Sequence, residues 1–205
     1  IFFDDGKIAG RIIRNAGGKI TVRIVQAGNT GSRLGSEKGI NLPDTAIETP
    51  ALTEKDIADL ESMALRADII GMSFVRNVSD IEQLRRRMDA LGATHVGTVL
   101  KIENKQAFEN LPRLLLSGLT HPPVGVMVAR GDLAVELGFE RLAEVQEQIL
   151  WLCEAAHVPV IWATQVLDTM ARSGMPSRAE VTDAVMSGRA ECVMLNKGPR
   201  VVSTV

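Results

Sequence analysis

Two apolar runs of this chain end in charged residues of the types that bind phosphate and metal ions. One run ends in Lys101 and Glu103, and a second ends in Arg130 and Asp132. A short apolar run flanked by turn-forming residues is typical of a buried strand. Because burying an unpaired charge is costly, these groups should meet an ion, a ligand or one another where the strands end. A lysine with two carboxylates is the set needed to hold a divalent metal and a phosphorylated anion.

The spacing of these residues narrows the chemistry. Lys101 and Glu103 are two apart and would share one face of a strand, where they could also form a plain salt bridge. Asp132 follows Gly131, and a glycine lets the backbone approach a ligand closely. Mg²⁺ usually takes one or two carboxylates and fills its other positions with water and substrate oxygens, which Glu103 and Asp132 satisfy. Zinc is not favoured, because no histidine has a metal-like spacing to another His or Cys.

Polar residues gather at the ends of all the strands that the sequence predicts. We expect five strands, over residues 68–74, 95–102, 124–129, 158–163 and 191–195. The polar residues at their carboxyl ends are Ser73, Arg76, Lys101, Glu103, Arg130, Asp132, Thr164, Gln165, Asn196 and Lys197. Barrels and open parallel sheets place their active sites at these ends. Any one of these residues could instead cap the following helix, as we expect Asn104 to do.

Helical patterns alternate with these strands. Thr53 and Asp56 predict a capping box at the start of one helix, and Ser79–Glu82 predict another. Further helices are expected from residue 105, with an interruption at Pro112, and over residues 139–157, 165–171, 178–187 and 201–205. None of the strands alternates polar with apolar residues, which is typical of a parallel sheet covered on its faces. The predicted fold class is therefore α/β.

Residues 1–42 have a different pattern from the rest. Alternating apolar residues flank Gly17 and Gly18, which predicts a β-hairpin. Glycines then punctuate a loop that leads to Pro43. The chain begins at Ile1 within an apolar run and ends within a helical pattern, so we expect a piece of a longer protein.

Composition excludes some classes of function. The 205 residues are 45% hydrophobic and 3% aromatic, with a net charge of −2, which gives no basic field for nucleic acid or a membrane surface. No apolar run reaches the ~20 residues of a membrane span. Cys153 and Cys192 lie in apolar sequence and are expected to be buried thiols in a reducing compartment, the cytoplasm.

Several motifs together resemble those of the pyruvate kinase family, in the same order and with approximately the same spacing. The most specific surrounds Arg130-Gly131-Asp132. The motifs are Asp4-Asp5-Gly6, Leu52-Thr53-Glu54-Lys55-Asp56, Ser73-Phe74-Val75-Arg76, Lys101-Ile102-Glu103-Asn104, Met127-Val128-Ala129-Arg130-Gly131-Asp132-Leu133, Ala163-Thr164-Gln165 and Ser177-Arg178-Ala179-Glu180. The likeness extends over nearly the whole chain.

This resemblance implies a fold and a reaction. Residues 1–42 would be the tail of a small β-domain inserted in a (β/α)₈ barrel, and residues 43–205 the later part of that barrel. The family transfers the phosphoryl group of phosphoenolpyruvate to ADP, giving pyruvate and ATP. It uses Mg²⁺ and K⁺, and the K⁺ ligands would lie outside this chain. The full-length protein is expected to be a homo-oligomer.

The resemblance also assigns residues. Lys101 would stabilise the phosphoryl group in transit, Glu103 and Asp132 would bind Mg²⁺, and Thr164 with water would relay a proton to the enolate. Phosphoryl transfer needs this positioning and charge rather than covalent help. The residues expected at the substrate are Ser73, Lys101, Ala129, Arg130, Gly131, Asp132 and Thr164.

Two departures from the family pattern indicate a divergent branch. Asn196-Lys197-Gly198-Pro199 replaces the usual Ser-Gly-Glu-Thr, and Ala134 replaces an expected glycine. Two other functions stay open. One is a Mg²⁺-dependent lyase or aldolase acting on pyruvate enolates, since such barrels also set Glu and Asp at neighbouring strand ends. The other is a regulatory or binding homologue that has lost turnover, which the altered Asn196–Pro199 segment supports best. Lys101 favours phosphoryl transfer over the lyase, which would usually rely on arginine.

Overall fold

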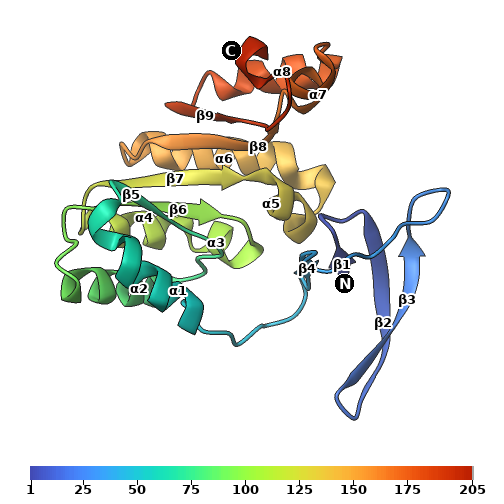
Figure 1. Ribbon diagram of the computed structural model, residues 1–205, viewed down its shortest axis with the longest axis horizontal. Helices are drawn as coiled ribbons and strands as arrows, with labels where there is room; N and C mark the ends of the chain where they lie inside the picture. Colours follow the sequence, from blue (N-terminus) through green and yellow to red (C-terminus); the bar gives the residue numbers. More distant parts are fainter. Residues whose placement is uncertain (205) are drawn as a thin grey trace.

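Two sheets make up the computed structural model of the chain, which describes residues 1–204 (Figure 1). The first is antiparallel, with the order β3-β2-β1-β4, and its strands are β1 Phe2–Phe3, β2 Ile8–Ala16, β3 Lys19–Gln26 and β4 Ile40–Asn41. The second is parallel, with the order β5-β6-β7-β8-β9, and its strands are β5 Ile69–Met72, β6 Gly97–Ile102, β7 Val124–Ala129, β8 Val160–Val166 and β9 Cys192–Leu195.

Helices connect the strands of the parallel sheet. The α-helices are α1 Glu54–Met63, α2 Val78–Ala90, α3 Lys105–Glu109, α4 Leu111–Leu119, α5 Arg130–Leu137, α6 Leu142–Ala155, α7 Asp168–Ser173 and α8 Arg178–Ser187. Three 3₁₀ helices are η1 Ala64–Arg66, η2 Phe139–Arg141 and η3 Val201–Thr204. The strand order follows the chain order without reversal, as in a (β/α)₈ barrel and unlike a doubly wound sheet. The predicted α/β class is confirmed.

The two faces of the parallel sheet differ in what they contact. Alternate strand residues, among them Leu100, Val126 and Trp162, are fully buried in one apolar cluster with residues of the surrounding helices. Lys101 falls between two such residues, Leu100 and Ile102, and Glu103 follows Ile102 just beyond β6, so both side chains lie on the opposite face. In a barrel that face is the interior, and its carboxyl end is where active sites form.

The predicted hairpin is present and extends away from the parallel sheet (Figure 1). Gly17 and Gly18 both have positive φ, as the two-residue turn of a hairpin requires. The two sheets meet at α5. Asn41 of β4 bonds to side chains of this helix, and Gly6 lies beside Val135 and Phe139.

Local predictions were right at some helix starts and wrong at others. The capping box of Thr53 with Asp56 is confirmed, as is the Asn104 cap of α3, which accepts from the Ala107 amide at 2.8 Å. The prediction of a capping box at Ser79 is wrong. The N-cap of α2 is Asn77, whose side-chain oxygen accepts from both Ser79 and the Asp80 amide. Asn77 was missed because a second possible cap follows two residues later.

Three further expectations need correction. Residues 139–157 were predicted as one helix, but a 3₁₀ turn precedes α6. The expected helix over residues 165–171 begins only at Asp168, because β8 continues to Val166. Cys153 is buried as predicted, and burial raises the pKa of its thiol to about 12. Cys192 is instead exposed, because its strand β9 is at the edge of the sheet.

The expected helix over residues 201–205 is a 3₁₀ helix as far as Thr204, and Val205 lies outside the described residues. No helix within residues 1–204 is both long enough and apolar enough to cross a membrane.

Candidate active site

Lys101 is held between two oxygen-bearing side chains at the end of β6. Its Nζ lies 2.8 Å from Oγ of Ser73, to which it donates, and 2.8 Å from Oε1 of Glu103. The Glu103 side chain is 5% exposed and that of Lys101 is 26% exposed. The predicted shared face of Lys101 and Glu103 is confirmed, and so is the possibility of a salt bridge between them. The ammonium is thus fixed in place while remaining accessible from the mouth of the sheet.

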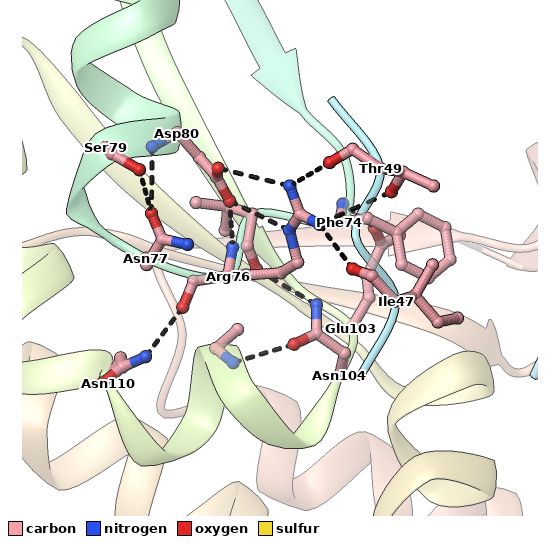
Figure 2. A network of polar contacts seen from close by, with 12 residues as sticks. Ile47, Thr49, Phe74, Arg76, Asn77, Ser79, Asp80, Glu103, Asn104 and Asn110 are labelled. Atoms are coloured by element: carbon pink, nitrogen blue, oxygen red, sulfur yellow. Dashed lines mark hydrogen bonds and ion pairs between the residues drawn. The ribbon is translucent and has the colours of Figure 1, made fainter. Parts of the chain in front are cut away.

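The loop after β5 is braced so that its backbone meets Glu103 (Figure 2). The amide of Phe74 donates to Oε2 of Glu103 at 2.6 Å. Asn104 donates to the carbonyl of Val75 at 3.0 Å, which ties the same loop to the start of α3. Glu103 therefore has both oxygens oriented by fixed donors.

Arg76 is a structural member of this network rather than a free cation (Figure 2). Its Nε lies 3.2 Å from Oδ2 of Asp80, and its guanidinium donates to the carbonyls of Ile47 at 3.2 Å and Thr49 at 2.9 Å. The carbonyl of Arg76 accepts from Asn110 at 2.9 Å. Arg76 thereby fastens the segment leading to α1 against the loop that carries Ser73 and Phe74.

Arg130, Gly131 and Asp132 form the first turn of α5. The helix follows β7 directly, with Ala129 as its N-cap and no side-chain cap. The first amide groups of an α-helix have no partner within the helix, and the helix dipole favours an anion there. The backbone of Gly131 and Asp132 is therefore suited to bind a carboxylate or phosphate. Sequence reasoning missed this helix because its polar first turn resembles a loop.

Asp132 shares an amide donor with a second acid. Asn41, only 4% exposed, donates from Nδ2 to Oδ1 of Asp132 at 3.3 Å and to Oε1 of Glu136 at 3.0 Å. Burial raises the pKa of Glu136 and the nearby Asp132 charge adds to this, while the Asn41 hydrogen bond opposes it. Asn41 and Glu136 were both missed, because nothing in the sequence shows that β4 reaches α5.

Thr164 has a left-handed backbone at the end of β8. Its φ is 72° and that of Gln165 is 58°, and the pairing of β8 with β9 is irregular between Trp162 and Val166. A β-branched residue rarely adopts positive φ, at a cost of about 1–3 kcal/mol. A Cβ added to Gly131 would come within 3.0 Å of the Thr164 methyl carbon. The side chain of Thr164 therefore lies against the first turn of α5.

The Arg130 side chain is directed into the protein. Its Nε donates to the carbonyl of Ala163 at 2.8 Å, Nη2 donates to the carbonyl of Thr164, and Nη1 pairs with Asp183 of α8. The guanidinium lies over the Trp162 ring, 4.7 Å from its centroid. The structure thus joins Ser73, Lys101 and Glu103 in one cluster, and Gly131 with Thr164 in another, at the carboxyl ends of neighbouring strands.

The donor set suits Mg²⁺. Glu103 and Asp132 offer carboxylate oxygens, the hard ligands that Mg²⁺ prefers. Within residues 1–204, no three His, Cys, Asp or Glu side chains gather as a metal cage. An ion held by these two carboxylates would therefore complete its coordination with water and substrate oxygens. We predict that the carboxyl groups of Glu103 and Asp132 face one shared cavity, as a single ion bound by both requires.

A cavity of about 720 Å³ adjoins the cluster of Ser73, Lys101 and Glu103. The segment 40–51 forms one wall, and the ends of β5 and β6 with the start of α3 form the other. Its lining includes Asn41, Ser73, Phe74, Arg76, Asn104 and Glu136. The lining thus takes in Ser73 and the Asn41–Glu136 pair, while Lys101, Glu103 and Asp132 are not among the residues that line it.

Comparison with known proteins agrees with this geometry. Residues 1–199 match the family model described as pyruvate kinase, barrel domain. The chain is 37% identical over 201 residues to a protein named pyruvate kinase from Candida albicans, covering 96% of this chain and 38% of the relative. Proteins of the same name from Hypocrea jecorina and Clostridium acetobutylicum are 39% and 34% identical over 200 residues. Each alignment covers 96% of this chain, with 35% and 40% of the respective relatives.

The chain thus spans about two fifths of the length of these relatives. The family match confirms that the five-stranded sheet is part of a (β/α)₈ barrel. On the strength of its sheet topology, its strand-end residues and these similarities, the chain belongs to the pyruvate kinase family.

Proposed function

We propose that the protein containing this chain transfers the phosphoryl group of phosphoenolpyruvate to ADP, forming pyruvate and ATP. The observation that carries this proposal is the placement of Lys101, whose ammonium is fixed by Ser73 and Glu103 at the mouth of the sheet. Phosphoryl transfer depends on positive charge held where charge develops in the transition state. We further propose that residues 1–42 belong to the inserted β-domain and residues 43–205 to the barrel.

The residues around Lys101 divide the work of binding and reaction. The first amides of α5, at Gly131 and Asp132, would receive an anionic group of phosphoenolpyruvate. Lys101 would neutralise the phosphoryl group as its bond to the enol oxygen breaks and a bond to the terminal phosphate oxygen of ADP forms. The enolate carbon then takes a proton, which the Thr164 hydroxyl would deliver through water. Thr164 adjoins the first turn of α5, which favours this assignment.

Glu103 and Asp132 would hold the Mg²⁺ that the family implies. This ion supplies positive charge that neutralises and orients phosphate oxygens. Contacts with Lys101 and Phe74 orient the Glu103 carboxylate, and a hydrogen bond from Asn41 orients that of Asp132.

A non-catalytic homologue is the second candidate, and the segment Asn196–Pro199 favours it. The Asn196 side chain donates to Asp168 of α7, and Gly198 is packed against the carbonyl of Ala171. Asn196 and Gly198 thus contact α7 within the protein, which would leave them unavailable to a ligand.

A coupled assay for pyruvate formation on the full-length protein tests the proposal. We expect turnover that requires ADP, Mg²⁺ and phosphoenolpyruvate together. Pyruvate formed from another substrate without ADP would instead support the lyase or aldolase. Binding of phosphoenolpyruvate with no turnover would support the non-catalytic homologue.

A further inference from the structure

We propose that Arg130 is a positioning residue that holds Thr164 in its left-handed conformation, and that Asp183 and Trp162 hold Arg130 in turn. For its activity readout this inference rests on the function proposed above. It concerns the side chain of Arg130, and the contact of its backbone with the substrate stays a prediction. The side chain is 10% exposed, and three of its nitrogens have partners within the protein.

The contacts of Arg130 converge on the backbone where β8 leaves regular geometry. Nε and Nη2 donate to the consecutive carbonyls of Ala163 and Thr164. These carbonyls flank the φ of 72° at Thr164, at the start of the irregular segment that ends at Val166. Successive side chains of a regular strand alternate between faces. If this segment relaxed to extended strand, the Thr164 hydroxyl would change its direction relative to α5.

The rest of the arrangement fixes the guanidinium itself. Asp183 approaches from α8 and pairs with Nη1, while the Trp162 ring lies under the guanidinium plane at 4.7 Å. Trp162 is fully buried and cannot yield readily. A planar fork held from two sides can serve two carbonyls at once, whereas a lysine ammonium on its flexible stem cannot reproduce that geometry. The arrangement therefore requires arginine rather than positive charge alone.

The activity test uses the full-length protein with variants Arg130→Lys, Thr164→Ala and the double variant. A misplaced reacting group can cost on the order of 10²-fold in rate. We expect Arg130→Lys to lower kcat by that order, with a much smaller change in the KM for phosphoenolpyruvate. If Arg130 acts through Thr164, the double variant should be no slower than Thr164→Ala alone. Effects that multiply in the double variant would overturn the inference, and so would full activity of Arg130→Lys.

Arg85 provides a matched control. It is 3% exposed and also donates to two backbone carbonyls, those of Val96 at 3.3 Å and His121 at 2.7 Å, near the amino ends of β6 and β7. We expect Arg85→Lys to lower the melting temperature while leaving kcat within about twofold of wild type. A loss in kcat equal to that of Arg130→Lys would show that any buried arginine has this effect, and would contradict a specific link to Thr164.

If the wild-type protein makes no pyruvate, the proposed function is refuted, but the inference about Arg130 is not. A structural measurement then tests that inference. The ¹³C-methyl resonance of Thr164 should shift in Arg130→Lys and stay unchanged in Arg85→Lys. If Arg130→Lys fails to fold, Asp183→Asn can replace it. This variant keeps the Arg130 guanidinium but weakens its ion pair, so the Thr164 methyl resonance should shift by less. An unchanged Thr164 resonance in whichever of the two variants folds would overturn the inference.

Discussion

Lys101 illustrates how one side chain can serve either structure or catalysis. Its ammonium touches Ser73 and Glu103, which a purely structural salt bridge would also explain. The two possibilities predict different losses, because an interaction made chiefly in the transition state lowers turnover more than binding.

We expect Lys101→Met in the full-length enzyme to lower kcat by on the order of 10²–10³, because such a loss is typical when one donor to developing charge is removed. Binding of phosphoenolpyruvate and Mn²⁺, measured by calorimetry, should persist. Lys101→Arg is the control that keeps the charge. Near-normal turnover of Lys101→Met at saturating metal and substrate would refute the catalytic role of Lys101 and leave it only a structural one.

Glu136 provides a pH-dependent test. Burial raises its pKa in the folded state above the usual value, so it favours folding while protonated. This contribution is fully present below the unfolded pKa and is lost as pH rises through the raised one. Glu136→Gln keeps an acceptor for Asn41 without the charge. In metal-free buffer, we expect the variant to match wild type in acid and to melt at a higher temperature at neutral pH. Parallel melting curves at every pH would refute this.

At the scale of elements, the junction of α5 with β8 depends on close packing. A methyl group at Gly131 would lie 3.0 Å from the Thr164 methyl carbon, so that side chain would have to move by a few tenths of an ångström. We expect Gly131→Ala to fold normally, because alanine favours helix, and to lose turnover. Thr164→Ser removes the opposing methyl group. The double variant Gly131→Ala, Thr164→Ser should therefore match Thr164→Ser alone, and a further loss in kcat would contradict the steric explanation.

Much of the element order was predictable, since buried parallel strands have short apolar runs and helices have caps. Lys101 and Glu103 were predictable as a pair because their spacing places them on one face at the end of β6. The bonds of Arg130 were not, because they depend on where α8 brings Asp183. The left-handed Thr164 was equally hidden, since its conformation depends on partners distant in sequence.

At the scale of the whole molecule, Asn41 connects the small sheet to the site. It bridges Asp132 and Glu136 from β4, the last strand before the parallel sheet begins. Loss of a residue that orients a metal ligand typically weakens metal affinity 10- to 100-fold. We expect Asn41→Ala to weaken Mn²⁺ binding by about 10-fold, as measured by electron paramagnetic resonance without substrate. Asn110→Ala, which removes a bond to the Arg76 carbonyl, is the control. Unchanged Mn²⁺ affinity would show that Asp132 needs no help from Asn41.

The consecutive strand order has a consequence for synthesis on the ribosome. Within the parallel sheet, each strand after β5 pairs with the strand made immediately before it: Gly97 with Ile69, Val124 with Thr98, and Val160 with Val126. The strands from β5 to β9 can therefore pair one β-α unit at a time as the chain emerges, in keeping with the tendency of domains to fold during synthesis. The newest strand always presents an open edge until its successor appears. A translational pause between β6 and β7 would therefore prolong exposure of the Gly97–Ile102 edge, to which another chain could pair.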